Sequence, residues 1–241
     1  ISKPSTWYFF PNSIANGKPT YPRPTTAILG EELLFKFIKN SNTINHFTKY
    51  AFKKKANVAV VTFAYEASSK YFNSLVDSLN NQSVSNFEVV IFNDNAKESI
   101  RYFEKLKVKY QIFDLLKDTP TGIRFQGFKI LKKLNYDIYI FQDCDDELSK
   151  SRVKDVSLMA QKYKLVVNDL DLIDHFSNVY ELKIWQSRFA FKSTFSYNDI
   201  LNYNFVGLGN TTIHKSLFDF FPSRPKGDIP ALDWYIFFSV L

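Results

Sequence analysis

Short, almost continuously apolar segments alternate with longer segments of helical periodicity from residue 57 onward. The apolar segments are rich in β-branched and aromatic residues, which is typical of strands buried on both faces of a sheet; they span residues 58–63, 87–92, 110–113 and 137–141. Between them, apolar residues recur at helical spacing over residues 69–82, 96–107 and 122–134. Because such alternation forms right-handed βαβ units, it predicts an α/β fold with a mostly parallel central sheet flanked by helices.

The length and composition exclude several other classes of protein. The 241 residues suffice for one large domain with a sizeable core. A chain that is 45% apolar, with 25 Phe, is too rich in core-forming residues to be disordered. The single cysteine, Cys144, excludes a disulfide scaffold and a cysteine zinc site. No apolar run approaches the ~20 residues that span a bilayer.

The positive charge is confined to one part of the chain. The 31 Lys and Arg exceed the 24 Asp and Glu by seven, which alone would favour a nucleic-acid partner. However, residues 1–55 hold nine Lys and Arg against two acids, whereas residues 56–241 hold 22 of each. The α/β segment is therefore balanced, and we do not expect it to bind nucleic acid.

Residues 1–55 differ in kind and are predicted to form a Pro-rich and helical extension to the domain of residues 56–241. Five of the nine prolines lie in residues 1–24, which predicts extended, irregular backbone there. Acids at the start and lysines at the end of residues 31–55 predict a helix, because these charges complement its dipole. Two interpretations of this basic helix remain open: it packs on the domain, or it contacts an anionic membrane peripherally.

Polar and acidic residues follow the predicted strands. Tyr65 and Asp94 end two of them, and a third is followed directly by Asp143, Asp145, Asp146 and Glu147. Ligands of parallel sheets bind at this edge, and crowded carboxylates are costly unless a cation neutralises them. Oxygen ligands suit Mg²⁺ or Mn²⁺. The alternative interpretation is a solvated acidic turn that caps the next helix.

Five motifs, in order along the chain, resemble the family-two GT-A glycosyltransferases. Residues 58–95 are similar to the opening of that fold, and residues 122–127 to its arginine-bearing loop and helix. Asp-Ile-Tyr-Ile-Phe-Gln-Asp-Cys-Asp-Asp, residues 137–146, resembles its strand and Asp-x-Asp motif. Residues 205–215 resemble the acceptor-side segment, and Leu-Asp-Trp-Tyr, residues 232–235, the Glu-Asp motif that opens a late helix. The resemblance covers residues 57–241.

The resemblance implies inverting transfer of a sugar from a nucleotide-sugar donor, by default a UDP-sugar, to a hydroxyl of a carbohydrate or glycolipid acceptor. The implied context is synthesis of a surface polysaccharide or glycolipid, in the cytoplasm or peripherally at the inner face of the membrane. Implied donor-binding residues are Tyr65 for the nucleobase, Asp94 for a base N–H, Arg124 for the nucleotide, Asp143 for the ribose, and Gly209 and Asn210 for close backbone approach. Asp145 matches the metal-binding position, with Asp146 as a close competitor.

Asp233 is the candidate catalytic base. It matches the Glu-Asp motif, and an inverting reaction needs a carboxylate that deprotonates the acceptor hydroxyl. The alternative is a helix N-terminal acid after Pro230, favoured by the helix dipole. Leu232 replaces the usual preceding acid. Family members continue further, so we expect either a C-terminal truncation or a short acceptor side.

Two other functions compete with this hypothesis. A non-catalytic nucleotide- or sugar-binding module would keep the donor site without turnover. A sugar-phosphate nucleotidyltransferase would need a Gly-rich first loop bearing Arg and Lys, whereas residues 63–69 contain neither glycine nor arginine. Transfer by a glycosyltransferase is therefore the preferred hypothesis.

Overall fold

A computed structural model describes residues 14–15, 18–19, 36–37, 56–174, 177–188, 194–201 and 203–241. Most of the predicted Pro-rich segment of residues 1–24 and most of the predicted helix of residues 31–55 lie outside these described residues. The division of the chain at residue 55 stays a prediction. Within the first segment, β1 (Ile14–Ala15) and β2 (Lys18–Pro19) pair antiparallel.

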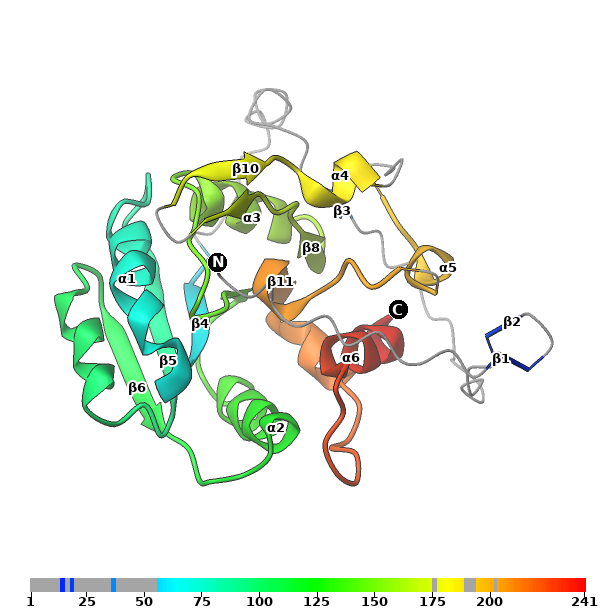
Figure 1. The fold of residues 1–241 in the computed structure, drawn as a ribbon, viewed down its shortest axis with the longest axis horizontal. Coiled ribbons are helices and arrows are strands. Elements are labelled where there is room, and N and C mark those ends of the chain that lie inside the picture. The colour runs from blue at the N-terminus through cyan, green and yellow to red at the C-terminus, as the bar shows by residue number, and fades with distance from the viewer. Residues whose placement is uncertain are drawn as a thin grey trace.

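A seven-stranded sheet organises the domain, with the order β3-β8-β11-β7-β4-β5-β6 (Figure 1). Its strands are β3 (Lys36–Phe37), β4 (Val58–Tyr65), β5 (Glu88–Asp94), β6 (Tyr110–Asp114), β7 (Ile138–Phe141), β8 (Leu165–Val167) and β11 (Thr211–His214). The pairs β4–β5, β5–β6, β4–β7 and β3–β8 are parallel, whereas β11 runs antiparallel to both β7 and β8. The predicted α/β class with a mostly parallel sheet is confirmed.

Helices connect the strands at the predicted places. The bounds of the longer ones are η2 (Glu66–Tyr71) continuing into α1 (Phe72–Asn80), η3 (Lys97–Lys105), α2 (Pro120–Leu131), α3 (Arg152–Ala160) and α6 (Leu232–Val240). Shorter ones are α4 (Ile184–Arg188), α5 (Tyr197–Ile200), η4 (Leu208–Asn210) and η5 (Lys215–Asp219). The segment predicted as a helix over residues 96–107 is a 3₁₀ helix, η3. Thr119 caps α2 by accepting a hydrogen bond from the Gly122 N–H.

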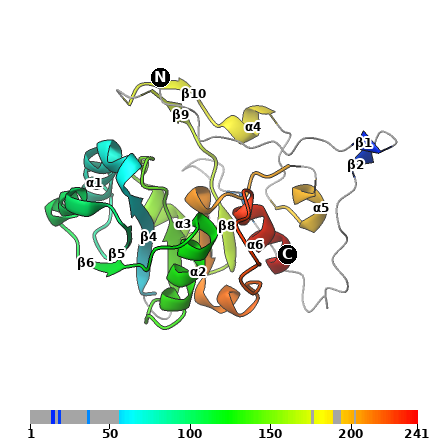
Figure 2. The same ribbon diagram turned by 60° about the horizontal axis from the view of Figure 1, so that its bottom comes forward.

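Both faces of the sheet are buried, each in its own core. On β4, Val58, Val60 and Ala64 point to a core formed with α1, η3 and α3, while Ala59, Val61 and Phe63 point to a core formed with α2, η5 and α6. Figure 2 shows β4 with α1 on one side and α2 on the other. Burial on both faces explains why the strands read as continuous apolar runs rather than as alternating ones.

A second sheet lies outside the central one. The hairpin of β9 (Leu172–Ile173) and β10 (Val179–Glu181) lies at the top of the molecule in both Figures 1 and 2. Its base is fixed by Asp169, whose carboxylate accepts hydrogen bonds from the backbone N–H groups of Trp185 and Gln186 at the start of α4. At the turn of the hairpin, the Ser177 hydroxyl donates to Glu147 at 2.6 Å.

The two described residues of the segment predicted as a helix over residues 31–55 form a strand instead. Lys36–Phe37 is β3, which pairs in parallel with β8 at the edge of the sheet. An open sheet edge offers unpaired N–H and C=O groups, and pairing with them satisfies the backbone of β3.

No helix in the described part of the chain is long and apolar enough to cross a membrane.

The core packing predicts a large difference between two leucines. Leu79 of α1 is 1% exposed, whereas Leu116 is 79% exposed. Leu79→Ala should lower the free energy of unfolding by about 2–5 kcal/mol, because it removes buried methyl groups and leaves a cavity. Leu116→Ala, the control, should change it by less than about 0.5 kcal/mol. Urea unfolding monitored by circular dichroism measures both, and equal losses would contradict the packing described here.

Candidate active site

The predicted site residues gather at one edge of the sheet. Strands β4, β5 and β7 run parallel, so Tyr65, Asp94 and the residues after Phe141 meet at their carboxyl ends. The chain extends the sheet from β4 to β5 and β6 on one side, and then returns to place β7 on the other side. Such a change of direction is where open α/β sheets bind ligands.

The acidic loop, residues 143–147, follows β7 directly. Asp143 is partly buried, whereas Asp145 and Asp146 are exposed. Burial, followed by the charge of Asp146, raises the pKa of Asp143 to about 7. Desolvation and then the charge of Asp145 raise the pKa of Asp146 to about 6.

Asp233 approaches the same place from the start of α6. Its Oδ2 accepts a hydrogen bond from the Leu208 N–H at 3.1 Å, and burial raises the pKa of its carboxyl. The Asp233 charge also contributes to the raised pKa of Asp143, so the two carboxylates are electrostatic neighbours. The candidate base and the acidic loop therefore belong to one site.

The glycine turn before β11 lies between these two carboxylates. A methyl group on Gly207 would come within 3.7 Å of Asp233 Oδ2. A methyl group on Gly209 would come within 2.2 Å of Asp143 Oδ2, which no side chain tolerates without movement. Gly209 is thus required by the close approach of its backbone to Asp143.

Asn210 fixes this turn from the other side. Its Nδ2 donates to the backbone oxygens of Asn168 at 3.0 Å and Phe205 at 3.1 Å. Asn210 is itself buried, and its Oδ1 has no hydrogen-bond partner within the described residues. The amide nitrogen therefore holds the turn by hydrogen bonds to the backbone, and direct contact of Asn210 with a sugar stays a prediction.

Arg124 is the cation that faces the site from α2. Its guanidinium lies over the Phe63 ring, with Cζ 4.1 Å from the ring centroid, a cation–π arrangement that fixes its orientation. Its positive charge acts against the raised pKa values of Asp94, Asp143 and Asp233. Arg124 therefore lies within electrostatic reach of both ends of the site.

Tyr65 and Asp94 form the other end, where β4 and β5 finish side by side. Burial, and then the charge of Asp145, raises the pKa of Tyr65, so its phenol stays neutral. Burial also raises the pKa of Asp94. A neutral aromatic ring next to a carboxylate can stack on a planar base and accept from its N–H.

Sequence patterns missed one residue that the structure places directly behind the site. Arg152 opens α3 and is 7% exposed, and its Nη2 donates to the backbone oxygens of Phe141 and Gly209, each at 2.8 Å. A cation in the first turn of a helix opposes the helix dipole. That mismatch, immediately after an acidic run, was the available signal. Cys144, between Asp143 and Asp145 in the acidic loop, is buried, which raises its thiol pKa to about 12 and excludes a thiolate nucleophile at neutral pH.

The acidic loop fits a divalent cation that is coordinated partly by carboxylates of the loop and partly by oxygens of a phosphate group. Asp145 and Asp146 offer exposed carboxylate oxygens, the donor type that Mg²⁺ and Mn²⁺ prefer. Among the described residues, no group of three or more His, Cys, Asp or Glu side chains forms a complete metal cage. One or two carboxylates are, however, the usual protein contribution when phosphate oxygens and water complete the coordination.

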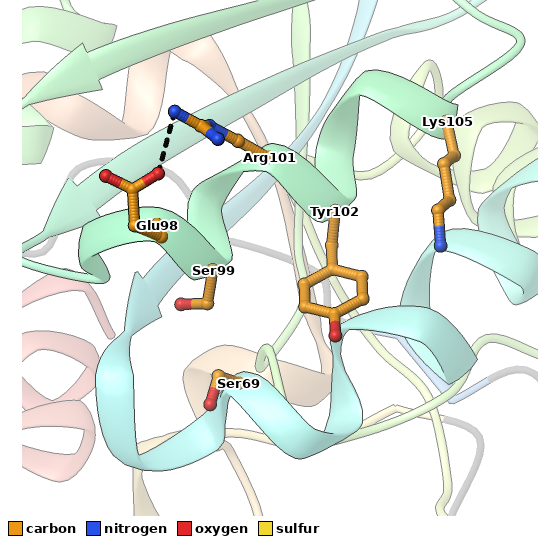
Figure 3. A pocket seen from close by; sticks show the side chains of 6 residues that line it. All are labelled: Ser69, Glu98, Ser99, Arg101, Tyr102 and Lys105. Atoms are coloured by element: carbon orange, nitrogen blue, oxygen red, sulfur yellow. Dashed lines mark ion pairs between the residues drawn. The ribbon is translucent and has the colours of Figure 1, made fainter.

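A separate shallow groove of about 490 Å³ lies between η2 and η3 (Figure 3). Its lining residues are Ser69, Glu98, Ser99, Arg101, Tyr102 and Lys105, and Glu98 and Arg101 form an ion pair at 2.8 Å. None of the predicted site residues lines this groove, so it is not the site described above.

The raised pKa of Asp143 predicts that stability falls as pH rises. Folded Asp143 keeps its proton up to about pH 7, whereas the unfolded chain releases it near about pH 4, so rising pH in this interval favours unfolding. In metal-free buffer, the wild type should therefore lose free energy of unfolding between pH 5.5 and pH 8, whereas Asp143→Asn should not lose this part. Relative to the wild type, the free energy of unfolding of Asp143→Asn should rise by about 1–2 kcal/mol over this interval, or its Tm by about 2–8 °C. Thermal unfolding of both proteins measures this, and a Tm difference independent of pH would contradict it.

Comparisons with known proteins agree with this architecture. The family model described as "Glycosyl transferase family 2" matches residues 59–220, more than half of the chain, although Asp233 lies beyond the match. No curated protein matches the chain. Among solved structures, TarS 1-349 from S. aureus matches with a TM-score of 0.53 and 19% identity, over 76% of this chain and 55% of that one.

TarS 1-349 in complex with UDP-GlcNAc matches with a TM-score of 0.58 and 20% identity, over 76% of this chain and 53% of that one. The complex of TarS 1-349 with UDP matches with a TM-score of 0.54 and 20% identity, over 76% of this chain and 54% of that one. The chain thus spans about half the length of these proteins, and identities this low show a shared fold. Together with the family match, the predicted resemblance is confirmed: the chain belongs to glycosyl transferase family 2.

Proposed function

We propose that the chain transfers a sugar from a nucleoside-diphosphate sugar to a hydroxyl acceptor, with inversion at the sugar carbon and with help from a divalent cation. The observation on which this proposal rests is that Asp143 and Asp233 both approach the turn that contains Gly207 and Gly209. This arrangement puts a candidate base next to the acidic loop, as a single displacement at the sugar carbon requires.

The donor nucleotide fits along the carboxyl edge of β4, β5 and β7. Tyr65 would stack on the base, Asp94 would accept from a base N–H, and Asp143 would bind the ribose. Arg124, whose charge reaches Asp94 and Asp143, would meet base or phosphate oxygens. The solved complexes of TarS with UDP and UDP-GlcNAc support a uridine donor here.

Asp145 and Asp146 would hold the cation, Mn²⁺ or Mg²⁺, at the diphosphate. When bound, such a cation neutralises the negative charge that develops on the departing nucleoside diphosphate. The exposure of both residues leaves room for phosphate oxygens and water in the coordination shell.

Asp233 would act as the general base. The Leu208 N–H occupies Oδ2 and orients the carboxylate, so Oδ1 is the atom that we expect to accept the proton of the acceptor hydroxyl. That hydroxyl oxygen then bonds to the sugar carbon, while the bond from this carbon to the phosphate oxygen breaks and the nucleoside diphosphate leaves with the electron pair. Burial raises the pKa of Asp233, which makes it a stronger base than an exposed carboxylate.

The proposed biological setting follows from the sequence resemblance. A carbohydrate or glycolipid acceptor, synthesis of a surface polysaccharide, and a cytoplasmic location rest on the sequence resemblance alone. Peripheral membrane contact through residues 31–55 concerns a segment that lies almost entirely outside the described residues. A non-catalytic binding module remains the competing function, and turnover is the measurement that separates the two.

Nucleotide binding should depend on metal. The full chain should bind UDP at least about tenfold more tightly with Mn²⁺ than with a chelator, and Asp145→Ala should abolish most of that gain, about 1.4 kcal/mol or more. Isothermal titration calorimetry with UDP, GDP and CDP also tests the choice of base. Asp77→Ala, which removes an exposed carboxylate of α1, is the control and should bind like the wild type. Absence of nucleotide binding by the wild type would exclude the proposed function.

Turnover should depend on Asp233. Asp233→Asn preserves shape and removes the base, so kcat for transfer or donor hydrolysis should fall by about 10²–10⁴-fold, while UDP binding stays near the wild-type value. The control Asp219→Asn alters an exposed carboxylate that pairs with Lys132 and should leave kcat unchanged. An Asp233→Asn variant with full activity would remove Asp233 as the base. A wild type that binds UDP–Mn²⁺ without any turnover would favour the binding module.

A further inference from the structure

Arg152 is the one charged side chain that is fully buried in the described part of the chain. Burying a guanidinium is expensive unless all of its donors find partners. Desolvation lowers the pKa of Arg152 to about 10, and the charges of Asp146 and Asp143 oppose this shift. The cost of burial is therefore offset by bonds and charges that belong to the site.

The guanidinium of Arg152 joins three neighbouring strands. Its Nη2 donates to the Phe141 backbone oxygen at the end of β7 and to the Gly209 backbone oxygen before β11, each at 2.8 Å. Its Nε donates at 3.1 Å to the Asn168 side chain, directly after β8, and its Nη1 donates to Gln142 Oε1. Since β8, β11 and β7 are adjacent in the sheet, one planar fork fixes their ends relative to each other.

Two of these partners hold Asp143. Gln142, whose Oε1 accepts from Arg152, donates from Nε2 to the Asp143 backbone oxygen at 3.1 Å. Gly209, whose backbone oxygen also accepts from Arg152, packs its Cα against the Asp143 carboxylate. The backbone of Asp143 and the space around its carboxylate are thus both set by contacts that lead back to Arg152.

We propose that Arg152 is a positioning residue, which through Gln142 and Gly209 holds Asp143 and the acidic loop in the arrangement that binds a cation together with a nucleoside diphosphate. This inference rests on the proposed function. The guanidinium of Arg152 donates to four protein acceptors, so it acts through these neighbours and not by contact with a ligand. This positioning requires the planar guanidinium and not only a positive charge, because a lysine ammonium cannot reach all four acceptors at the ends of the three strands.

The test compares the metal-dependent gain in UDP affinity, defined as the ratio of UDP dissociation constants with chelator and with Mn²⁺. In Arg152→Lys this ratio should fall to less than about a third of the wild-type value, and kcat should fall by about 10–100-fold, as expected for misplaced groups. UDP binding without metal should weaken less than UDP binding with Mn²⁺, because only the ribose contact of Asp143 is then affected. Tyr139→Phe is the control for stability alone, because it removes a buried hydrogen bond to the Leu131 backbone oxygen at 2.7 Å.

Several results would overturn the inference. An unchanged ratio in Arg152→Lys would do so, as would a loss in Tyr139→Phe that matches it at equal Tm. If Arg152→Lys does not fold, Gln142→Met provides the same measurement, since it removes both the acceptor for Arg152 and the donor to Asp143; an unchanged ratio there also overturns the inference. A wild type that binds no UDP excludes the proposed function itself, and is distinct from a wild type with a metal-dependent ratio that Arg152→Lys retains.

Discussion

The site depends on how negative charge is held at the edge of a sheet whose two faces are both buried. Asp143 follows β7 without an intervening turn, so its carboxylate starts within a few residues of the core. Burial raises the pKa values of Asp143 and Asp146, and the charges of Arg124 and Arg152, respectively, act against this rise. The turn before β11 then closes over Asp143 as tightly as only glycine permits. The position of the backbone around Asp143 and the charges around its carboxylate therefore depend on each other.

The central strands and the location of the site could be predicted from local sequence. The run at residues 58–63 became β4 and extends to Tyr65, and the run at residues 137–141 became β7. Strands buried on both faces must be apolar throughout, so they are recognisable without knowledge of their partners. Acidic residues that follow such a strand lie at the ligand-binding edge by topology alone. This is why Asp94, Asp143 and the loop after it could be assigned to one edge.

Contacts between distant segments could not be predicted in this way. Nothing in the four residues of β11 indicates that it enters antiparallel between β7 and β8, because that order depends on pairing across some 70 residues of chain. The helical pattern of residues 31–55 gave no sign of β3, since an edge strand of two residues is stabilised by its partner and not by its own sequence. The partners of Arg152 come from the ends of β7 and β8 and from the turn before β11, which lie far apart in the sequence, so its position at the start of α3 could not identify them.

The charges of the candidate site favour binding of a divalent cation together with the nucleotide. Three carboxyl groups of the candidate site, on Asp143, Asp146 and Asp233, interact electrostatically with the guanidiniums of Arg124 or Arg152. Burial is the main cause of the raised pKa values of Asp143, Asp146 and Asp233, and neighbouring carboxylates add to it at Asp143 and Asp146. Arg152 cannot move toward a ligand, because its donors are already used in the sheet. A nucleoside diphosphate adds negative charge, so it can approach the acidic loop favourably only if a cation accompanies it. On the proposed function, the same acids would make the binding of metal and the binding of nucleotide mutually dependent.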